Sequence, residues 1–517
     1  MLLKNSSSEN IQKSIVFGCF CVFFGLLFSK GILSLSVVYF CILCFLIGDF
    51  SNPFKQIRNQ KPFYFFLFFI AYYLSSLLWS TDLKAGLSDS ISKLNLFFFP
   101  IIWTILPKIE ANYKSKILAI FTGMVIIASI INFVVYQYNY SPENDIRSLA
   151  LFVSHIRFSL FISFTIFILV RVKTKNYAKK IGIICCILWL LFYTYYAQVL
   201  SGLLVLFVGC ITLAFIELRS SYRWKKISAL LFLTISFFSI SYLLILLLSN
   251  ESQIILEKKL PKYTKLGHLY THDSNSKAFE NGYPLDCYIN ESEMDSVWKL
   301  KSKINLNSYD QNDFRYKTVL IRYLTSKGLT KDAEGVNKLT KSDITNIEHG
   351  IPTILELETG LQKRIHALKY ELNSQQNPNG HSLLHRIEYW KTGWYIFKKH
   401  WLLGTGIGDY KNAYQKEYIS QKSILEPQYR LESHNQFLGI LVATGSLGLS
   451  LFLLHLSFTF SYFWKNKNKI ALIFFSICIA SFLVEDTLTT LAGMSFYSFF
   501  TGIFLNVHGT TEYPSKK

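Results

Sequence analysis

The sequence predicts an all-α protein, a polytopic transmembrane helix bundle of about 12 helices with one large, mostly helical loop outside the membrane. Residues 1–249 and 434–507 consist mainly of apolar blocks, each close to the roughly 20 residues that a spanning helix needs. Residues 250–433 are instead polar and mixed in charge. Because 51% of the 517 residues are hydrophobic, we expect one transmembrane part before the loop and another after it.

About nine apolar segments precede the loop and about three follow it. In chain order they are residues 14–29, 31–50, 62–80, 88–107, 116–137, 150–170, 181–197, 199–217, 227–249, 434–463, 470–487 and 491–507. Residues 508–517 are expected to form a cytoplasmic tail.

Lysine and arginine gather in alternate short loops, and this pattern predicts the orientation of the helices. With the N-terminus in the cytoplasm, the cytoplasmic loops carry far more Lys and Arg than the short loops on the other side, as the positive-inside rule requires. Residues 250–433 then lie outside the cytoplasm. Much of the formal net charge of +20 sets this orientation, and it indicates contact with anionic membrane lipids rather than with nucleic acid.

The segment after a breaker cluster at residues 373–380 has the pattern of an interfacial helix. Trp390, Trp394, Phe397 and Trp401 are spaced to lie on one helical face, with lysines elsewhere. Arg386 lies one turn before Trp390 on the same face. The tryptophan face packs onto the transmembrane bundle or holds Arg386 at the depth of the lipid phosphates, and these two interpretations are compatible.

Two motifs follow this helix. A glycine-rich stretch begins at Gly404, includes Gly406 and ends at Asp409. No strand precedes it, so we interpret it as a tight turn that ends the interfacial helix and not as a dinucleotide-binding loop. The chain then enters the membrane again through His434 and Asn435.

Together, these motifs resemble the O-antigen ligase and O-antigen polymerase family of bacterial membrane glycosyltransferases. The residues that carry the resemblance are Arg386 with Trp390, the Gly-Thr-Gly-Ile-Gly-Asp turn at 404–409, Ser433-His434-Asn435-Gln436-Phe437-Leu438, and Gly445-Ser446-Leu447-Gly448-Leu449. The motif region covers about residues 380–450, and the helix count and the outer loop extend the likeness over the chain. The resemblance does not separate a ligase from a polymerase.

The resemblance implies a multi-pass enzyme of the bacterial inner membrane, with its large loop in the periplasm. Its donor would be a glycan on undecaprenyl diphosphate. Its acceptor would be a sugar hydroxyl, on lipid A–core for a ligase or on a growing glycan for a polymerase. The resemblance also implies that transfer needs no cofactor and no metal ion.

Arg386 and His434 suit this chemistry and are the predicted catalytic residues. An arginine binds phosphate oxygens bidentately and stays charged, so Arg386 is the expected clamp on the diphosphate leaving group. A histidine is well poised to take the acceptor's proton near neutral pH, so His434 is the expected base. Asn435 is among the polar neighbours expected to orient it.

The family pattern leaves the second cation open. Members often carry a second functional arginine just after a serine near the start of a middle helix, but residues 199–203 hold no arginine. Arg157 is one alternative, because a charge inside a membrane helix is a functional candidate by default. It is equally well explained as a packing residue that reaches the membrane surface. Arg430, four residues before His434, is another candidate for the second cation.

Glu485 and Asp486 lie at the outer end of a predicted membrane segment. They steer a sugar, orient His434, or cap a re-entrant turn, and the sequence leaves these roles open. The predicted substrate-binding residues are therefore Arg157, Trp390, Gly404, Gly406, Asp409, Arg430, Asn435, Glu485 and Asp486.

Two other classes of function are open to a polytopic membrane protein with a large loop, a transporter and a non-catalytic scaffold. Transporters usually show internal repeats with charged or broken helices in corresponding halves, whereas this chain carries its polar residues in one asymmetric loop. A scaffold that uses the loop only to bind partners differs from an enzyme in lacking transfer activity. The predicted function is an O-antigen ligase-like transfer, with a polysaccharide polymerase as the main alternative.

Overall fold

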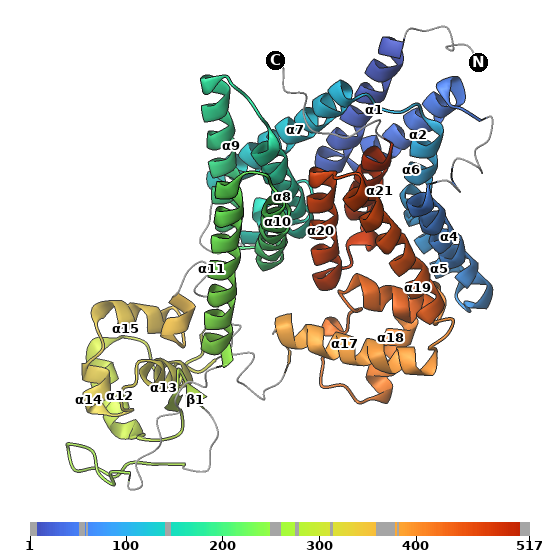
Figure 1. Cartoon of the computed structure of the whole chain (residues 1–517). Coiled ribbons are helices and arrows are strands. Elements are labelled where there is room, and N and C mark those ends of the chain that lie inside the picture. The colour runs from blue at the N-terminus through green and yellow to red at the C-terminus, as the bar shows by residue number, and fades with distance from the viewer. Residues whose placement is uncertain are drawn as a thin grey trace. The chain divides into compact units, whose positions relative to one another are not determined.

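The computed structural model describes residues 8–50, 57, 60–139, 146–248, 260–273, 279–310, 314–357, 378–379 and 382–506. It divides the chain into two compact units, Met1–Ser236 with Asn377–Lys517, and Phe237–Gln376. The predicted all-α fold is confirmed, because helices dominate both units (Figure 1). Within the described residues, the strands are two pairs of residues in the second unit.

Helices form most of the first unit. Those before the second unit are α1 (Ser8–Phe28), α2 (Lys30–Ile47), α4 (Lys61–Ser75) with the 3-10 helix η1 (Ser76–Trp79), α5 (Leu83–Ser92), α6 (Leu94–Ile105), α7 (Ala111–Tyr138), η2 (Ile146–Leu149), α8 (His155–Arg171), α9 (Tyr177–Tyr196), α10 (Leu200–Leu218) and α11 (Arg223–Leu248), whose residues are divided between the units. Those after it are α17 (Ser382–Lys399), α18 (Tyr410–Ser420), η4 (Pro427–Tyr429), α19 (Gln436–Lys465), α20 (Lys469–Val484), η5 (Thr487–Thr489) and α21 (Leu491–Leu505).

Eight helices in the described residues are long and apolar enough to cross a membrane, and they match eight of the twelve predicted segments. The other four segments form shorter helices. Segment 150–170 contains α8, segment 470–487 contains α20, and segment 491–507 contains α21. Segment 88–107 is not one helix: the chain turns at Lys93 between α5 and α6. The tail predicted at 508–517 lies outside the described residues.

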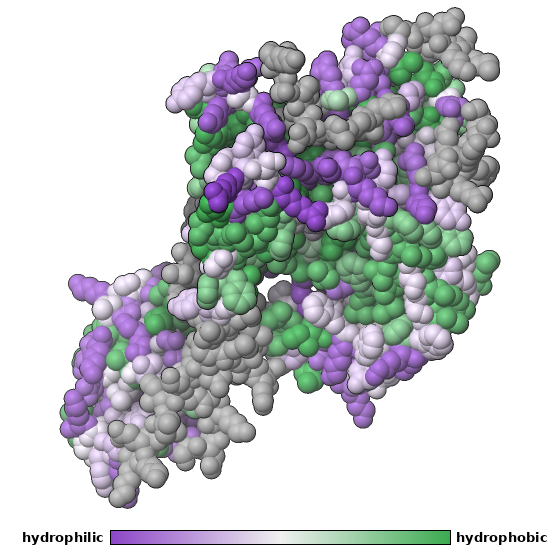
Figure 2. All heavy atoms as spheres, in the orientation of Figure 1, coloured by the Kyte–Doolittle hydropathy of each residue, from purple (hydrophilic) through white to green (hydrophobic). Residues whose placement is uncertain are grey.

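Aromatic packing holds the helices of the first unit together. The ring centroid of Phe500 on α21 lies 4.9 Å from that of Phe121 on α7, 5.0 Å from that of Phe164 on α8 and 5.5 Å from that of Phe23 on α1. Such pairs add to the free energy gained by apolar burial. On the face of this unit shown in Figure 2, hydrophobic surface lies between hydrophilic edges, one of them over α18.

The second unit is a small helical domain with a core of its own. Its elements are β1 (Phe279–Glu280), β2 (Tyr283–Pro284), α12 (Glu291–Lys301), α13 (Tyr316–Ser326), α14 (Ala333–Asn337), α15 (Lys341–Glu348) and η3 (Ile354–Leu357). Trp298 and Tyr323 are fully buried in that core. Its cysteine, Cys287, is 1% exposed and is therefore shielded from reagents in the folded state.

The predicted interfacial helix is α17, which the structure packs within the first unit. Tyr389 and Ile396 form its buried face, against α18 and α19. Trp394 and Trp401 are 48% and 59% exposed, so the tryptophan face is not the one that packs on the bundle. The breaker cluster at 373–380 lies outside the described residues except for 378–379.

Candidate active site

A buried carboxylate lies where four segments of the first unit meet. Glu485 follows the last residue of α20, with extended backbone, and its side chain is 6% exposed. An ionised carboxylate is stable at such a place only when cations or hydrogen-bond donors surround it. Arg386, Arg157 and His434 supply them, and we call these three residues with Glu485 the cation cluster.

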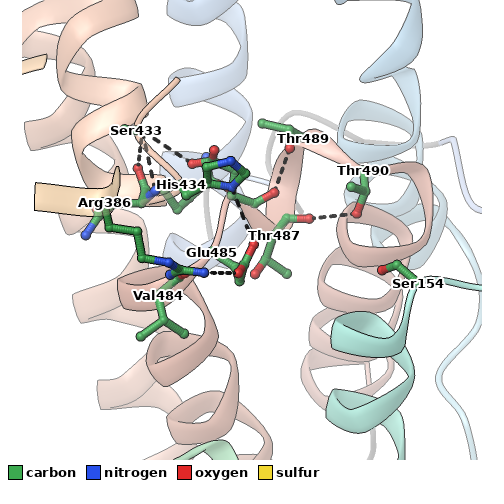
Figure 3. Close-up of polar contacts among 12 residues, drawn as sticks. Ser154, Arg386, Ser433, His434, Val484, Glu485, Thr487, Thr489 and Thr490 are labelled. Atoms are coloured by element: carbon green, nitrogen blue, oxygen red, sulfur yellow. Dashed lines mark hydrogen bonds and ion pairs between the residues drawn. The ribbon is translucent and has the colours of Figure 1, made fainter. Parts of the chain in front are cut away.

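Arg386 reaches Glu485 from the first half of α17. Its Nη2 lies 2.6 Å from Glu485 Oε1, and its Nη1 donates to the carbonyl oxygen of Val484. That carbonyl is at the C-terminus of α20, where the partial negative charge of the helix dipole also favours a cation. Figure 3 shows Arg386 and His434 both directed at Glu485.

Arg157 approaches the same carboxylate from the first turn of α8. Its Nε donates to Thr490 Oγ1 at 3.0 Å and its Nη2 to the carbonyl oxygen of Asp486 at 3.1 Å. Its Nη1 lies 3.9 Å from Glu485 Oε2 and makes no hydrogen bond to any described residue. A buried charged donor without an acceptor is costly, so Nη1 is ready for an anionic oxygen.

His434 stands at the entrance of α19 in a left-handed backbone conformation, with φ of 45°. Such a conformation is strained for a residue other than glycine and persists where the surroundings fix it. Here Trp390 Nε1 donates to the carbonyl oxygen of Ser433 at 2.9 Å, and the His434 ring lies 5.7 Å from the ring of Tyr389. The His434 Nδ1 is 3.7 Å from Glu485 Oε2.

Asn435 fixes the position of this turn. Its Oδ1 accepts from the amide of Leu438 and caps α19, and its Nδ2 donates to the carbonyl oxygen of Leu483 at 2.9 Å. The first bond satisfies a free amide at the helix start. The second ties the start of α19 to the end of α20, so His434 and Glu485 keep their separation.

The two adjacent carboxylates have pKa values shifted in opposite directions. Burial alone would raise the pKa of Glu485, but the facing imidazole of His434 and the charges of Arg386 and Arg157 outweigh it and hold this pKa below its usual value. Burial raises the pKa of Asp486 to about 6, although the charge of His434 opposes it. The facing carboxylate of Glu485 raises the pKa of His434 in turn. Neighbouring titratable groups whose pKa values are shifted apart are common at catalytic sites.

The glycine-rich turn supports a break in α19. Gly445 has φ of 64° and ψ of −168° inside that helix, which leaves its neighbours without helical hydrogen bonds. The turn replaces them: the amides of Thr405 and Gly406 donate to the carbonyl oxygens of Val442 and Ala443, each at 2.9 Å. Irregular backbone at membrane depth requires such partners.

Glycine is required at this contact because the two backbones nearly touch. Gly404 has φ of 74°, and an added Cβ would lie 2.5 Å from backbone atoms of α19. Gly406 has φ of 83°, and its Cβ would lie 2.3 Å from Ser80 Oγ. Both glycines position the site through the backbone. A direct role for them in substrate binding stays a prediction.

Asp409 and Arg430 have partners away from the cation cluster. The Asp409 carboxylate accepts from Thr81 N and Oγ1, both at 2.7 Å, and from Asp82 N at 3.1 Å, which fastens the turn to the start of α5. Arg430 Nε donates to the carbonyl oxygen of Leu425 at 2.8 Å. Of the two candidates for a second cation, the structure brings Arg157 to Arg386. A substrate-binding role for Asp409 or Arg430 stays a prediction.

A cavity of about 610 Å³ opens on the other side of Asp486. Its walls come from α4, α5, α6, the glycine-rich turn, the start of α18 and the first turns of α19. The charged residues in these walls are Asp82, Asp89, Lys93, Lys411, Glu432 and Asp486. Sequence reasoning identified only Asp486 among them. The signal available for Asp89 and Lys93 was the polar start of segment 88–107, which departs from a membrane pattern. Asp82, Lys411 and Glu432 lie outside that segment.

Comparison with known proteins identifies a family match in part of the chain. Residues 351–453 match the family described as O-antigen ligase, a segment that contains Arg386, the glycine-rich turn, His434 and the break at Gly445. A comparison with curated proteins gives no match. The family match supports a membrane glycosyltransferase of the O-antigen ligase or polymerase type.

Proposed function

Because residues 351–453 match the family described as O-antigen ligase, we propose that the chain transfers a glycan from undecaprenyl diphosphate to a sugar hydroxyl on lipid A–core. The observation that carries the proposal is the cation cluster, in which Arg386 and Arg157 converge on one buried carboxylate. Two guanidinium groups at one point form a site for a diphosphate, which is doubly charged and rich in acceptor oxygens.

The cation cluster serves the leaving group. As the bond between the anomeric carbon and the diphosphate oxygen breaks, its electron pair stays on the diphosphate. The unfilled Nη1 of Arg157 and the half-buried guanidinium of Arg386 are placed to bind the developing charge. Donors that are fixed before the reaction stabilise such charge most effectively. Glu485 holds both arginines in place.

His434 serves the acceptor. Its Nδ1 faces Glu485, which favours the tautomer that carries its proton on Nδ1 and leaves Nε2 free to take the hydroxyl proton. The acceptor oxygen then bonds to the anomeric carbon. Glu485 raises the pKa of His434. The neutral, basic form of His434 therefore becomes the main form at a higher pH than for an isolated histidine.

The test measures carrier-lipid binding and transfer rate on the same detergent-purified variants. His434→Ala is expected to bind donor nearly normally while transfer falls ~10²–10⁴-fold, the usual effect of losing a general base. Arg386→Ala is expected to lose donor binding and most transfer, and Arg386→Lys to keep part of both. The matched control is Lys391→Ala, an exposed cation on the same helix. Near-normal transfer by His434→Ala would place the base elsewhere.

The same assay tests whether transfer requires a metal ion, and the envelope glycans test which product is formed. Transfer is expected to persist in excess EDTA, because protein cations bind the diphosphate. Loss of transfer on chelation and its return with magnesium would contradict this mechanism. Envelope glycans of a deletion strain separate the two reactions: loss of a ligase leaves bare core with carrier-linked polymer, whereas loss of a polymerase leaves core with one repeat.

We also propose that the enzyme lies in the bacterial inner membrane with its large loop in the periplasm. Cys287 is unsuitable as a probe because it is buried. Cysteines placed at Leu300 (86% exposed) and Tyr177 (77% exposed) mark the predicted periplasmic and cytoplasmic sides. In intact spheroplasts an impermeant thiol reagent should label Leu300→Cys, and Tyr177→Cys only after permeabilisation. The reverse pattern would invert the topology.

A further inference from the structure

The cavity beside the cation cluster is lined by other residues than those proposed to bind the donor diphosphate. None of Arg157, Arg386 and His434 lines it. Asp486 connects the two regions, because its side chain lines the cavity while its backbone carbonyl accepts from Arg157. A ligand held on Asp486 therefore lies at the edge of the cation cluster.

The charge of the cavity is opposite to that of the cation cluster. Four carboxylates and two lysines line it. Lys93 forms an ion pair with Asp89, which leaves Lys411 beside Asp82, Glu432 and Asp486. Phosphate groups would be repelled here, since like charges brought together at a binding surface cost several kcal/mol. Carboxylates, amides and hydroxyls are instead good partners for sugar hydroxyls.

The remaining walls are apolar. The outer ends of α4 and α6 contribute them, with Phe69, Ile70, Leu74, Leu96 and Phe97. The volume of about 610 Å³ lies within the roughly 300–1,000 Å³ of typical small-molecule sites. One end of the cavity therefore suits a polar ligand and the other an apolar extension of that ligand.

We propose that this cavity is the acceptor subsite and that it takes an uncharged, hydroxyl-rich sugar carried by an amphiphile, with Asp486 accepting a hydrogen bond from the sugar. The proposal rests on the function proposed above and names the class of its acceptor. Asp486 Oδ1 can accept a further hydrogen bond from the sugar, because a carboxylate oxygen has two lone pairs. The hydroxyl of Ser433 donates to it over a long 3.5 Å, and the neighbouring position on α19 is Gly439, which carries no side chain to cover it.

The arrangement separates the two substrates during transfer. The acceptor sugar presents a hydroxyl from the cavity, and the diphosphate stays on the arginines. The hydroxyl oxygen forms its bond to the anomeric carbon, the hydroxyl proton passes to His434, and the diphosphate leaves with the bonding electron pair. The sugar residue that is glycosylated consequently bears no phosphate in this subsite.

The first test locates a neutral probe on the full-length protein. The protein is purified in a detergent without a sugar head group, exposed to a photoreactive alkyl maltoside, irradiated and mapped by mass spectrometry. Cross-links are expected on α5, on the start of α18 or beside Asp486. Ala85→Trp narrows the mouth of the cavity at an exposed position and should reduce labelling there by roughly tenfold or more. Its matched control is Lys84→Trp, next to it and outside the lining.

The second test addresses the class of ligand. Displacement of the probe is compared for an alkyl glucoside and for the same glucoside carrying a phosphate. The neutral compound is expected to compete at a concentration at least about tenfold lower. Glu432→Lys should narrow that difference, because it reverses one of the charges that repel phosphate. Equal competition by the two compounds in the wild type would contradict the proposal that the cavity takes an uncharged sugar.

The outcomes separate this inference from the proposed function. Cross-links outside the cavity, or equal effects of Ala85→Trp and Lys84→Trp, would overturn the acceptor subsite. Neither result depends on donor binding. Undisturbed binding of the diphosphate lipid by Arg386→Ala would instead overturn the donor site, whether or not the sugar probe binds in the cavity.

Discussion

The cation cluster and the acidic cavity meet at two consecutive residues, Glu485 and Asp486. These two carboxylates have different surroundings. Glu485 is enclosed by Arg386, Arg157 and His434. Asp486 faces a cavity where carboxylates outnumber lysines. These surroundings hold the pKa of Glu485 below its usual value, whereas burial raises the pKa of Asp486 to about 6. Neighbours in the tertiary structure, not residue type, give the two carboxylates different environments.

The largest expected effect comes from breaking the cation cluster at its centre. Glu485→Gln leaves Arg157 and Arg386 buried without their counter-charge, and such a loss lowers the free energy of unfolding by about 3–5 kcal/mol. Unfolding of the purified variant, followed by tryptophan fluorescence, measures it. Glu426→Gln, at an exposed carboxylate, is the matched control. Equal stability of the two variants would show that Glu485 does not hold the arginines.

The ion pairs of Glu485 also predict how the free energy of unfolding depends on pH. A depressed folded-state pKa means that Glu485 contributes stability above its unfolded pKa, near the reference value of 4.5, and that this contribution disappears as the pH falls through the lower folded value. The free energy of unfolding of the wild type should therefore fall towards that of Glu485→Gln in that acidic range. A difference that persists unchanged well below pH 4.5 would contradict the ionised pair.

The next largest effect concerns the turn that supports both regions. Gly404→Ala forces a Cβ to within 2.5 Å of α19 backbone atoms at φ of 74°, and backbone strain of this kind costs about 1–3 kcal/mol. Both donor binding and sugar labelling should weaken together. Gly123→Ala, on α7 with nothing within 4 Å of the added Cβ, should be neutral or stabilising. A neutral Gly404→Ala would show that the turn can move away from α19.

The smallest expected effect separates the cavity from the cation cluster. Asp486→Asn should raise the acceptor KM by roughly tenfold while donor binding stays near normal. It should not lower stability near neutral pH, because the raised pKa of Asp486 means that the fold disfavours the ionised form. This is the opposite of the expectation for Glu485→Gln.

The pH dependence of acceptor binding checks the same residue. Asp486 is faced by His434, Glu485, Arg157 and Glu432. In the wild type the acceptor KM should rise as the pH falls through about 6 and Asp486 becomes protonated. The variant should lack this rise. A rise of equal size in Asp486→Asn would assign the titration to one of the facing groups, with His434 the first to examine.

The sequence by itself determined the fold class, the number of apolar segments and the motifs. Hydrophobic blocks of spanning length predict helices, and the tryptophan spacing predicted that Arg386 and Trp390 share one face of a helix. Arg386 and His434 were candidates because their motifs resemble a known family, and Arg157 because a charge inside a membrane helix is a functional candidate by default. Glu485 was a candidate from its place at the end of a predicted membrane segment.

Only the tertiary structure decided which candidates meet. Arg157 and Glu485 are more than 300 residues apart in the chain, and no local pattern pairs them. Long-range packing of α8, α17, α19 and α20 brings them to one point. The same is true of the cavity, whose walls come from α4–α6 and from α18–α19. Local helix propensity and the spacing of apolar residues determine where helices form. The contacts between distant helices depend instead on the shapes and charges that those helices bury together.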